Sequence, residues 1–150
     1  MELSFSKAEL KMLVEMAVMA DWVMTAHDVD DDERKDPYIK LCQKIYAFAH
    51  KNGMKKEIDF IEDIKEYSPN PDWEDESLAR TFIDEFEEKT FWDELIEKLS
   101  ERDLNRKLKG KKAENFHQHM EIFEEFSEKY TAEFCQNELE NVEIVAKTKK

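Results

Sequence analysis

Glycine and proline are scarce in this chain, which has two glycines and three prolines among 150 residues. Multi-stranded sheets and glycine-cradled phosphate sites depend on turns that these residues form, so the composition argues against both. Glutamate, lysine, leucine, methionine and alanine are abundant instead, and their side chains lose little rotamer freedom in a helix. Ten Phe, four Tyr and three Trp residues supply bulk for a core. We therefore predict a folded, mostly helical chain.

Cysteine and long apolar runs are also scarce. Cys42 and Cys135 lie far apart and form no C-x-x-C pair. The opening segment MELSFSKAEL lacks the basic head and apolar run of a signal peptide. The longest apolar-rich run, residues 12–24, contains Glu15 and Asp21 and is shorter than the roughly 20 residues of a membrane span. These features predict a cytoplasmic protein without a membrane span.

Basic residues are outnumbered by acidic ones: 37 Asp and Glu against 23 Lys and Arg give a formal net charge of −14. Nucleic acids and anionic membranes bind proteins through cationic groups that neutralise fixed negative charge. The sequence therefore predicts neither as a partner, and a basic protein is the charge-complementary choice. P-loop, dinucleotide and G-x-S-x-G fingerprints are absent, so we predict no cofactor and name no catalytic residue.

The first predicted helix follows an S-x-x-E capping box, with Ser6 as the N-cap and Glu9 as its partner. Helical spacing continues to about Ala26, and positions 10–24 are apolar outside one narrow polar stripe. A helix that is apolar over most of its circumference has to be covered on nearly all sides, by the rest of the fold or by a second subunit. We expect this helix to lie at the centre of the fold.

A second helix is predicted between the start signal Asp36-Pro37, with Asp36 as the N-cap, and the stop signal Asn52-Gly53. A third, shorter helix is expected to follow. Its apolar positions are Met54, Ile58, Ile61 and Ile64.

The second half of the chain repeats these helical signals. Thr90 and Asp93 form a possible capping box, and the helix that they open should bend or restart near Ser100. The last helix is predicted from about Lys112 to about Gln136, with a stripe of aromatic residues along one face.

These patterns predict one all-α domain, residues 1–150, built as a compact bundle of five to seven helices. The apolar N-terminal helix is expected at its centre, with the aromatic stripe of the last helix against it. Residues from about 138 onwards fit either further helix or a frayed tail.

The stretch TAHDVDDDERKDPY is rich in carboxylates and invites comparison with a calcium loop. An EF-hand that starts at Asp28 would place Asp30 and Asp32 at ligand positions. Glu33, however, stands where the loop needs glycine, and Ile39 stands where the closing bidentate glutamate belongs. We therefore predict a solvated connection, whose acidic side chains favour the start of the following helix.

A loose divalent-cation site is the alternative for this stretch. In that interpretation His27 and the carboxylates of Asp28, Asp30 and Asp32 converge on one ion. A lone histidine lacks the ligand cluster of a metal site, and a half-buried His27 under the following loop is the favoured interpretation.

A second carboxylate group lies in the predicted last helix. Glu124, Glu125 and Glu128 form an E-E-x-x-E pattern that resembles half of the motif of the all-helical nucleotide pyrophosphohydrolases. That resemblance implies glutamates that hold magnesium near a triphosphate. The later E-x-x-D of the family is absent, and Glu140 and Glu143 match it only in part.

The first helix is apolar enough to suggest self-association. Val18 and Trp22 interrupt its polar stripe, and a two-fold dimer would bury them, with Met19 as a further interface candidate. Coverage by the last helix of the same chain is the alternative. Trp73, beside Pro71, is either an exposed contact or is packed under the following helix, which we favour.

No inward-facing group of polar residues emerges from these patterns. The sequence therefore predicts a non-enzymatic protein–protein interaction or regulatory module that acts as a homo-oligomer, most simply a homodimer. The alternative is a metal-dependent all-α hydrolase similar to the nucleotide pyrophosphohydrolases, using the clustered glutamates.

Overall fold

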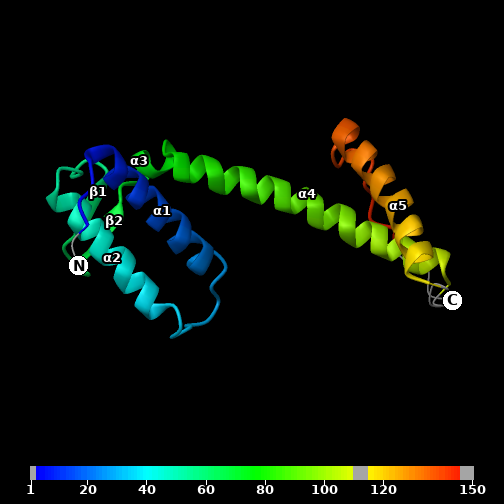
Figure 1. Ribbon diagram of the computed structural model, residues 1–150, viewed down its shortest axis with the longest axis horizontal. Coiled ribbons are helices and arrows are strands. Elements are labelled where there is room, and N and C mark those ends of the chain that lie inside the picture. Colours follow the sequence, from blue (N-terminus) through cyan, green and yellow to red (C-terminus); the bar gives the residue numbers. More distant parts are fainter. Residues whose placement is uncertain (1–2, 110–114, 146–150) are drawn as a thin grey trace. The chain divides into compact units, whose positions relative to one another are not determined.

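The computed structural model describes residues 3–109 and 115–145 of the chain. Of these residues 67 % are helical, in five α-helices, and one two-stranded β-hairpin completes the secondary structure of the described part (Figure 1). The prediction of a predominantly helical chain is confirmed, and the hairpin departs from the all-α prediction. The chain divides into two compact units, Met1–Phe86 and Glu87–Lys150. The single-domain prediction stays a prediction, and a bundle around a central N-terminal helix is not confirmed.

Helix α1 spans Lys7–Thr25 and begins as its sequence predicts. The Ser6 amide donates to the Glu9 carboxylate at 2.7 Å, and the Glu9 amide donates to the Ser6 hydroxyl at 3.3 Å. The two bonds satisfy amides that the first helical turn leaves without partners, and they lower the pKa of Glu9.

Helix α2 spans Asp36–Lys51 and runs back antiparallel to α1 (Figure 1). Its N-cap is Lys35 rather than the predicted Asp36, because a turn from Asp32 has already brought Lys35 into helical geometry. The stop signal is confirmed, since α2 ends at Lys51 and Gly53 adopts a φ of 101°, which glycine tolerates best.

A β-hairpin replaces the predicted third helix. Strand β1 (Ile58–Ile61) pairs antiparallel with β2 (Glu66–Pro69), with Ile58 opposite Pro69. Lys65 lies in the turn with a φ of 59°, in the left-handed region that glycine usually occupies. The turn contains no glycine, so the sequence carries no signal for it.

The hairpin is fixed to α2 by one side chain. The Gln43 amide nitrogen donates to the Tyr67 carbonyl, and the Tyr67 amide donates to the Gln43 carbonyl oxygen, both at 2.9 Å. Through these two bonds the Gln43 side chain pairs with the backbone of β2 at the outer edge of the hairpin and holds it against α2.

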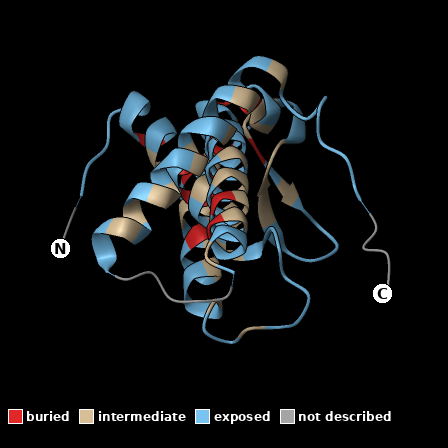
Figure 2. Cartoon of the chain, turned by 90° about the vertical axis from the view of Figure 1, so that its right-hand side faces the viewer, coloured by how far each residue is buried: buried red, intermediate tan, exposed pale blue. Residues whose placement is uncertain are grey.

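The core of the first unit lies where α1, α2 and the hairpin meet, with the short α3 (Pro71–Asp75) and the start of α4 against it. Buried residues are red in Figure 2. The fully or almost fully buried members are Leu10, Val14, Ala17, Val18, Cys42, Tyr46, Ala49, Met54, Ile58 and Ala79.

Helix α4 is one continuous helix of 30 residues, Leu78–Lys107. The predicted start at Thr90 and a restart near Ser100 are both wrong, because both residues lie within this one helix. Ser100 is fully buried, and the helix continues through it although the apolar pattern changes at this point.

Helix α5 spans Phe116–Asn137 and packs against α4 in the second unit. The Trp92 and Phe134 rings have centroids 5.6 Å apart, so part of the predicted aromatic stripe lies against α4. The predicted helix start at Lys112 lies outside the described residues, and the predicted end near Gln136 is close to the observed one.

A hydrogen-bonded group around Asp103 joins α4 to α5. Its carboxylate accepts from Arg102 at 2.9 Å, from Arg106 at 3.0 Å and from the Tyr130 hydroxyl. Arg102 also donates to the Tyr130 oxygen at 2.9 Å. The Arg102 hydrogen bond is the main cause that lowers the pKa of Asp103 well below its usual range.

We expect Asp103→Asn to destabilise the helical hairpin by about 1 kcal/mol at pH 7. The pKa of an unfolded aspartate is about 3.9 and that of folded Asp103 is lower, so its contribution is complete above about pH 4 and declines as the pH falls toward the folded value. Urea unfolding of both proteins at a series of pH values checks this. Asp93→Asn, an exposed change on the same helix, is the control. An equal loss from both variants would contradict the assignment.

Candidate functional site

Helix α1 is only half covered by its own unit. The side that includes Val14 and Val18 is buried, whereas Met16 is 62 % exposed and Val23 is 70 % exposed. The first unit by itself therefore does not cover this helix on nearly all sides, and coverage by a second subunit stays a prediction. Methionine side chains are flexible and polarisable, which suits them to contact with a partner.

Helix α2 contributes a second apolar surface beside that of α1. Cys42, Tyr46 and Ala49 turn into the core, while Tyr38 and Leu41 stay more than half exposed. Helix α2 thus has two adjacent apolar faces, and the core of its own unit covers only one of them.

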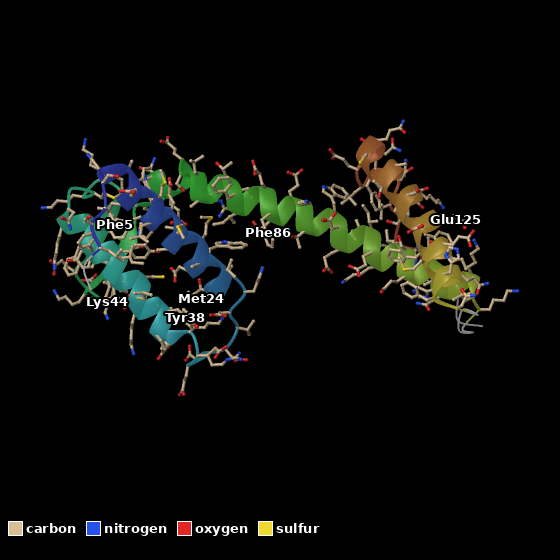
Figure 3. All side chains as sticks on the ribbon, in the orientation of Figure 1. Phe5, Met24, Tyr38, Lys44, Phe86 and Glu125 are labelled. Carbon is tan, nitrogen blue, oxygen red and sulfur yellow. The ribbon has the colours of Figure 1, made fainter. Side chains whose placement is uncertain are left out.

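Between the two exposed surfaces lies an apolar groove with a cavity of about 530 Å³. Its size falls within the range of typical ligand or docking pockets, and no charged side chain lines it. The lining includes Leu13, Met16, Val23 and Met24 of α1 and Tyr38, Leu41 and Ile45 of α2. Met24 and Tyr38, labelled in Figure 3, mark the end nearest the connecting loop.

The floor of the groove is closed by a tight helix contact. The Cys42 thiol lies 3.8 Å from the Ala17 carbonyl, to which it donates. Burial raises the pKa of Cys42, and the nearby Asp21 carboxyl raises it further. The thiol therefore stays protonated and acts as a small packing group rather than a nucleophile.

Charge is distributed unevenly along the two helices that form the groove. The connection at residues 27–36 carries the carboxylates Asp28, Asp30, Asp31, Asp32, Glu33 and Asp36, with two cations. Residues 37–56 contain no acidic residue and carry Lys40, Lys44, Lys51, Lys55 and Lys56. One end of the groove is thus acidic and the α2 side toward the other end is basic.

Two carboxylates of the acidic connection, Asp28 and Asp32, bond to cations of the same segment. Asp32 accepts from the Arg34 guanidinium at 2.7 to 3.1 Å, which lowers its pKa to about 2. Asp28 pairs with Lys35, which also donates to the Met24 carbonyl and so ties the connection to α1. Asp30 is exposed.

His27 is exposed, not half-buried, and its ring meets that of Trp22 edge-on at 6.3 Å between centroids. Within residues 3–109 and 115–145, no three His, Cys, Asp or Glu side chains form a group that could hold a metal ion. The structure therefore does not bring His27, Asp28, Asp30 and Asp32 together as a ligand set.

The glutamates of α5 also remain apart from any ligand group in the described part of the chain. Glu124, Glu125 and Glu128 are all exposed. Glu125 forms an ion pair with Lys107 of α4, so one member of the E-E-x-x-E pattern serves the contact between the two helices.

The predicted interface residues differ in their surroundings. Val18 is 3 % exposed and belongs to the core of its own unit, so it offers little surface to a partner. Trp22 and Met19 are half-buried. Trp73 is half-buried against the core, and its amide donates to the N-cap Asn70.

The groove residues of α2 are those that sequence reasoning missed. Tyr38 and Leu41 share helical spacing with Ile45, and this spacing does not show which of the three is covered. The signal that could have found them is the width of the apolar surface on α2, which spans two stripes.

No helix in the described ranges is long and apolar enough to cross a membrane. No protein-family model matches the sequence, and no curated protein or solved structure is significantly similar to it. A proposal about function therefore has to be argued from the exposed residues and charges described above.

Proposed function

We propose that this protein is a non-enzymatic interaction or regulatory module that acts as a homodimer through the α1–α2 groove. The observation that carries the proposal is the uncharged cavity of about 530 Å³, bordered by the exposed Met16, Val23, Tyr38 and Leu41. Exposed apolar surface gathered in one patch is typical of a binding site. A standard interface buries about 800 Å² per partner.

Charge complementarity favours a second copy of the chain as the occupant. A two-fold axis across the groove would set the two α2 helices antiparallel. The α2 helix has 16 residues and is about 24 Å long, so the acidic connection of one copy would come near Lys51 of the other. The apolar groove would then form the interface core and the opposite charges its rim.

A basic partner protein is the second candidate. The net charge of −14 opposes the approach of two copies at low salt and favours a cationic helix. In this case the groove would receive an amphipathic helix, as other helical grooves do.

The clustered glutamates of α5 give the metal-dependent hydrolase less support. Their side chains are exposed, and Glu125 is engaged by Lys107. Magnesium ligands of such an enzyme have to converge on a cleft with the substrate phosphates.

We expect light scattering at micromolar concentration to give twice the chain mass of 18.0 kDa. Met16→Glu should return the mass to that of one chain without loss of helicity, because the carboxylate would be desolvated at the apolar interface. Phe82→Glu is the matched control, since Phe82 is 52 % exposed on α4 and does not line the groove. A single-chain mass for the unmodified protein would refute the dimer. A basic partner protein would then be the remaining candidate for the groove.

A charge exchange locates the orientation. Asp31→Lys or Lys51→Asp alone should weaken the dimer, and the two together should restore most of its affinity, because the opposite charges again face each other. Simple addition of the two losses would contradict the antiparallel arrangement.

A further inference from the structure

Methionine is concentrated along the α1–α2 groove. Met16, Met19 and Met24 of α1 all line its cavity, to which the described residues contribute no charged side chain. The lining side chains that carry a polar hydrogen are Tyr38 and Cys42, and the Cys42 thiol already donates to a backbone carbonyl. A polar atom placed in this wall therefore has few hydrogen-bond partners there.

Exposure separates one of these methionines from the other two. Met16 is more than half exposed, whereas Met19 and Met24 are half-buried. Among the methionines in the described ranges, only Met12 is exposed to a similar extent, and it lies one helical turn before Met16 without lining the cavity. An oxidant dissolved in water has to reach the sulfur atom, so Met12 and Met16 are the sites that it attacks first.

We propose that Met16 is a modification site, at which reversible oxidation to the sulfoxide dissociates the dimer. This inference rests on the proposed function, because it concerns the groove as the contact between two copies. The Met16 sulfur attacks one oxygen of hydrogen peroxide, so that an S–O bond forms and the O–O bond breaks. The proton on the transferred oxygen goes to the departing hydroxide, which leaves as water. The sulfur loses two electrons and the peroxide gains them.

The sulfoxide weakens the contact because it is polar. Its oxygen is a hydrogen-bond acceptor that water satisfies while Met16 faces solvent. In the dimer the second copy covers the groove, so the oxygen loses its water and meets an uncharged wall. Two-fold symmetry places two copies of Met16 in the same interface, and the loss counts twice. We expect the dissociation constant to rise about tenfold or more.

A contact that buries Met16 should also protect it from oxidation. The oxidation rate of Met16 should therefore fall as the protein concentration is raised above the dissociation constant of the dimer, and the rate of Met12 should fall much less. Peptide mass spectrometry after a brief treatment with hydrogen peroxide measures both rates in one sample. A Met16 rate that does not depend on protein concentration would overturn the proposal.

The main test treats the full chain with hydrogen peroxide and follows its mass by light scattering. The oxidised protein should approach the single-chain mass with unchanged far-UV circular dichroism, and a thiol-dependent methionine sulfoxide reductase should restore the dimer. Met16→Leu keeps the size and apolar character of the side chain but removes the sulfur, so this variant should stay dimeric after the same treatment. Met16→Gln introduces a polar side chain of similar length and should weaken the dimer about tenfold or more without peroxide.

Met12→Leu is the matched control, since it removes the other exposed methionine of α1 and leaves the cavity lining unchanged. Its dimer should dissociate on oxidation as the unmodified protein does. Equal protection by Met12→Leu and Met16→Leu, or a dimer that survives complete oxidation of Met16, would overturn the proposal and leave the dimer itself intact. Loss of helicity on oxidation would assign the effect to the buried Met54 and would also overturn it. A single-chain mass before peroxide is added would instead refute the dimer, and this inference with it.

Discussion

Val18→Glu should unfold the Met1–Phe86 unit or bring it close to unfolding. Val18 is 3 % exposed within the core, and the buried residues in the described part of the chain include no cation to pair with a carboxylate placed there. An uncompensated buried charge costs about 3–5 kcal/mol, which is much of the stability of an ordinary domain. Urea unfolding followed by far-UV circular dichroism measures the loss.

Val23→Glu is the matched comparison for this prediction. Val23 lies on the same helix, is 70 % exposed and lines the groove. The same substitution there should change the free energy of unfolding of the single chain by no more than about 0.5 kcal/mol. It should also dissociate the dimer. If Val18→Glu instead dissociates a stable protein while Val23→Glu does not, the interface lies on the Val18 side of α1 and the groove is not the contact.

Ile58→Ala should destabilise the same unit by about 2–4 kcal/mol. Ile58 is fully buried where β1 meets the core, so its truncation removes packing contacts and leaves a cavity. Ile64→Ala should cost less than about 0.5 kcal/mol, because Ile64 is 58 % exposed in the hairpin turn.

This pair of variants also separates the hairpin from a helix. In a helix Ile58, Ile61 and Ile64 would share one buried face, and their truncations would cost similar amounts. Equal losses from Ile58→Ala and Ile64→Ala would therefore contradict the strand assignment. The measurement is again the free energy of unfolding in urea.

The β-hairpin shows where local pattern gives an ambiguous answer. Isoleucine every third residue fits a helix, and the chain has no Asn-Gly or Gly-rich turn between the two strands. The turn depends on Lys65 in the left-handed region, which any residue can adopt at a cost. That cost is offset by contacts far away in sequence, the Gln43–Tyr67 pair and the burial of Ile58.

Helix α4 shows the opposite effect: local signals predict a helix start at Thr90, but the helix continues through this position. Thr90 and Asp93 have capping-box spacing, yet both lie inside one helix. A capping box contributes about 1 kcal/mol to a helix end, and continuing the backbone hydrogen bonds of an existing helix removes the need for it.

The sequence by itself determined the helical content, the start of α1 at the Ser6 capping box and the end of α2 at Asn52-Gly53. These are decided by contacts within a few residues, so one chain segment contains all the information. Only the tertiary structure decided which apolar face of α1 is covered, that Tyr38 and Leu41 border an open groove, and that Met16 lines this groove while Met12 does not. The physical reason is that burial depends on which segments pack together across long stretches of chain, and periodicity shows that a face is apolar but not what lies against it.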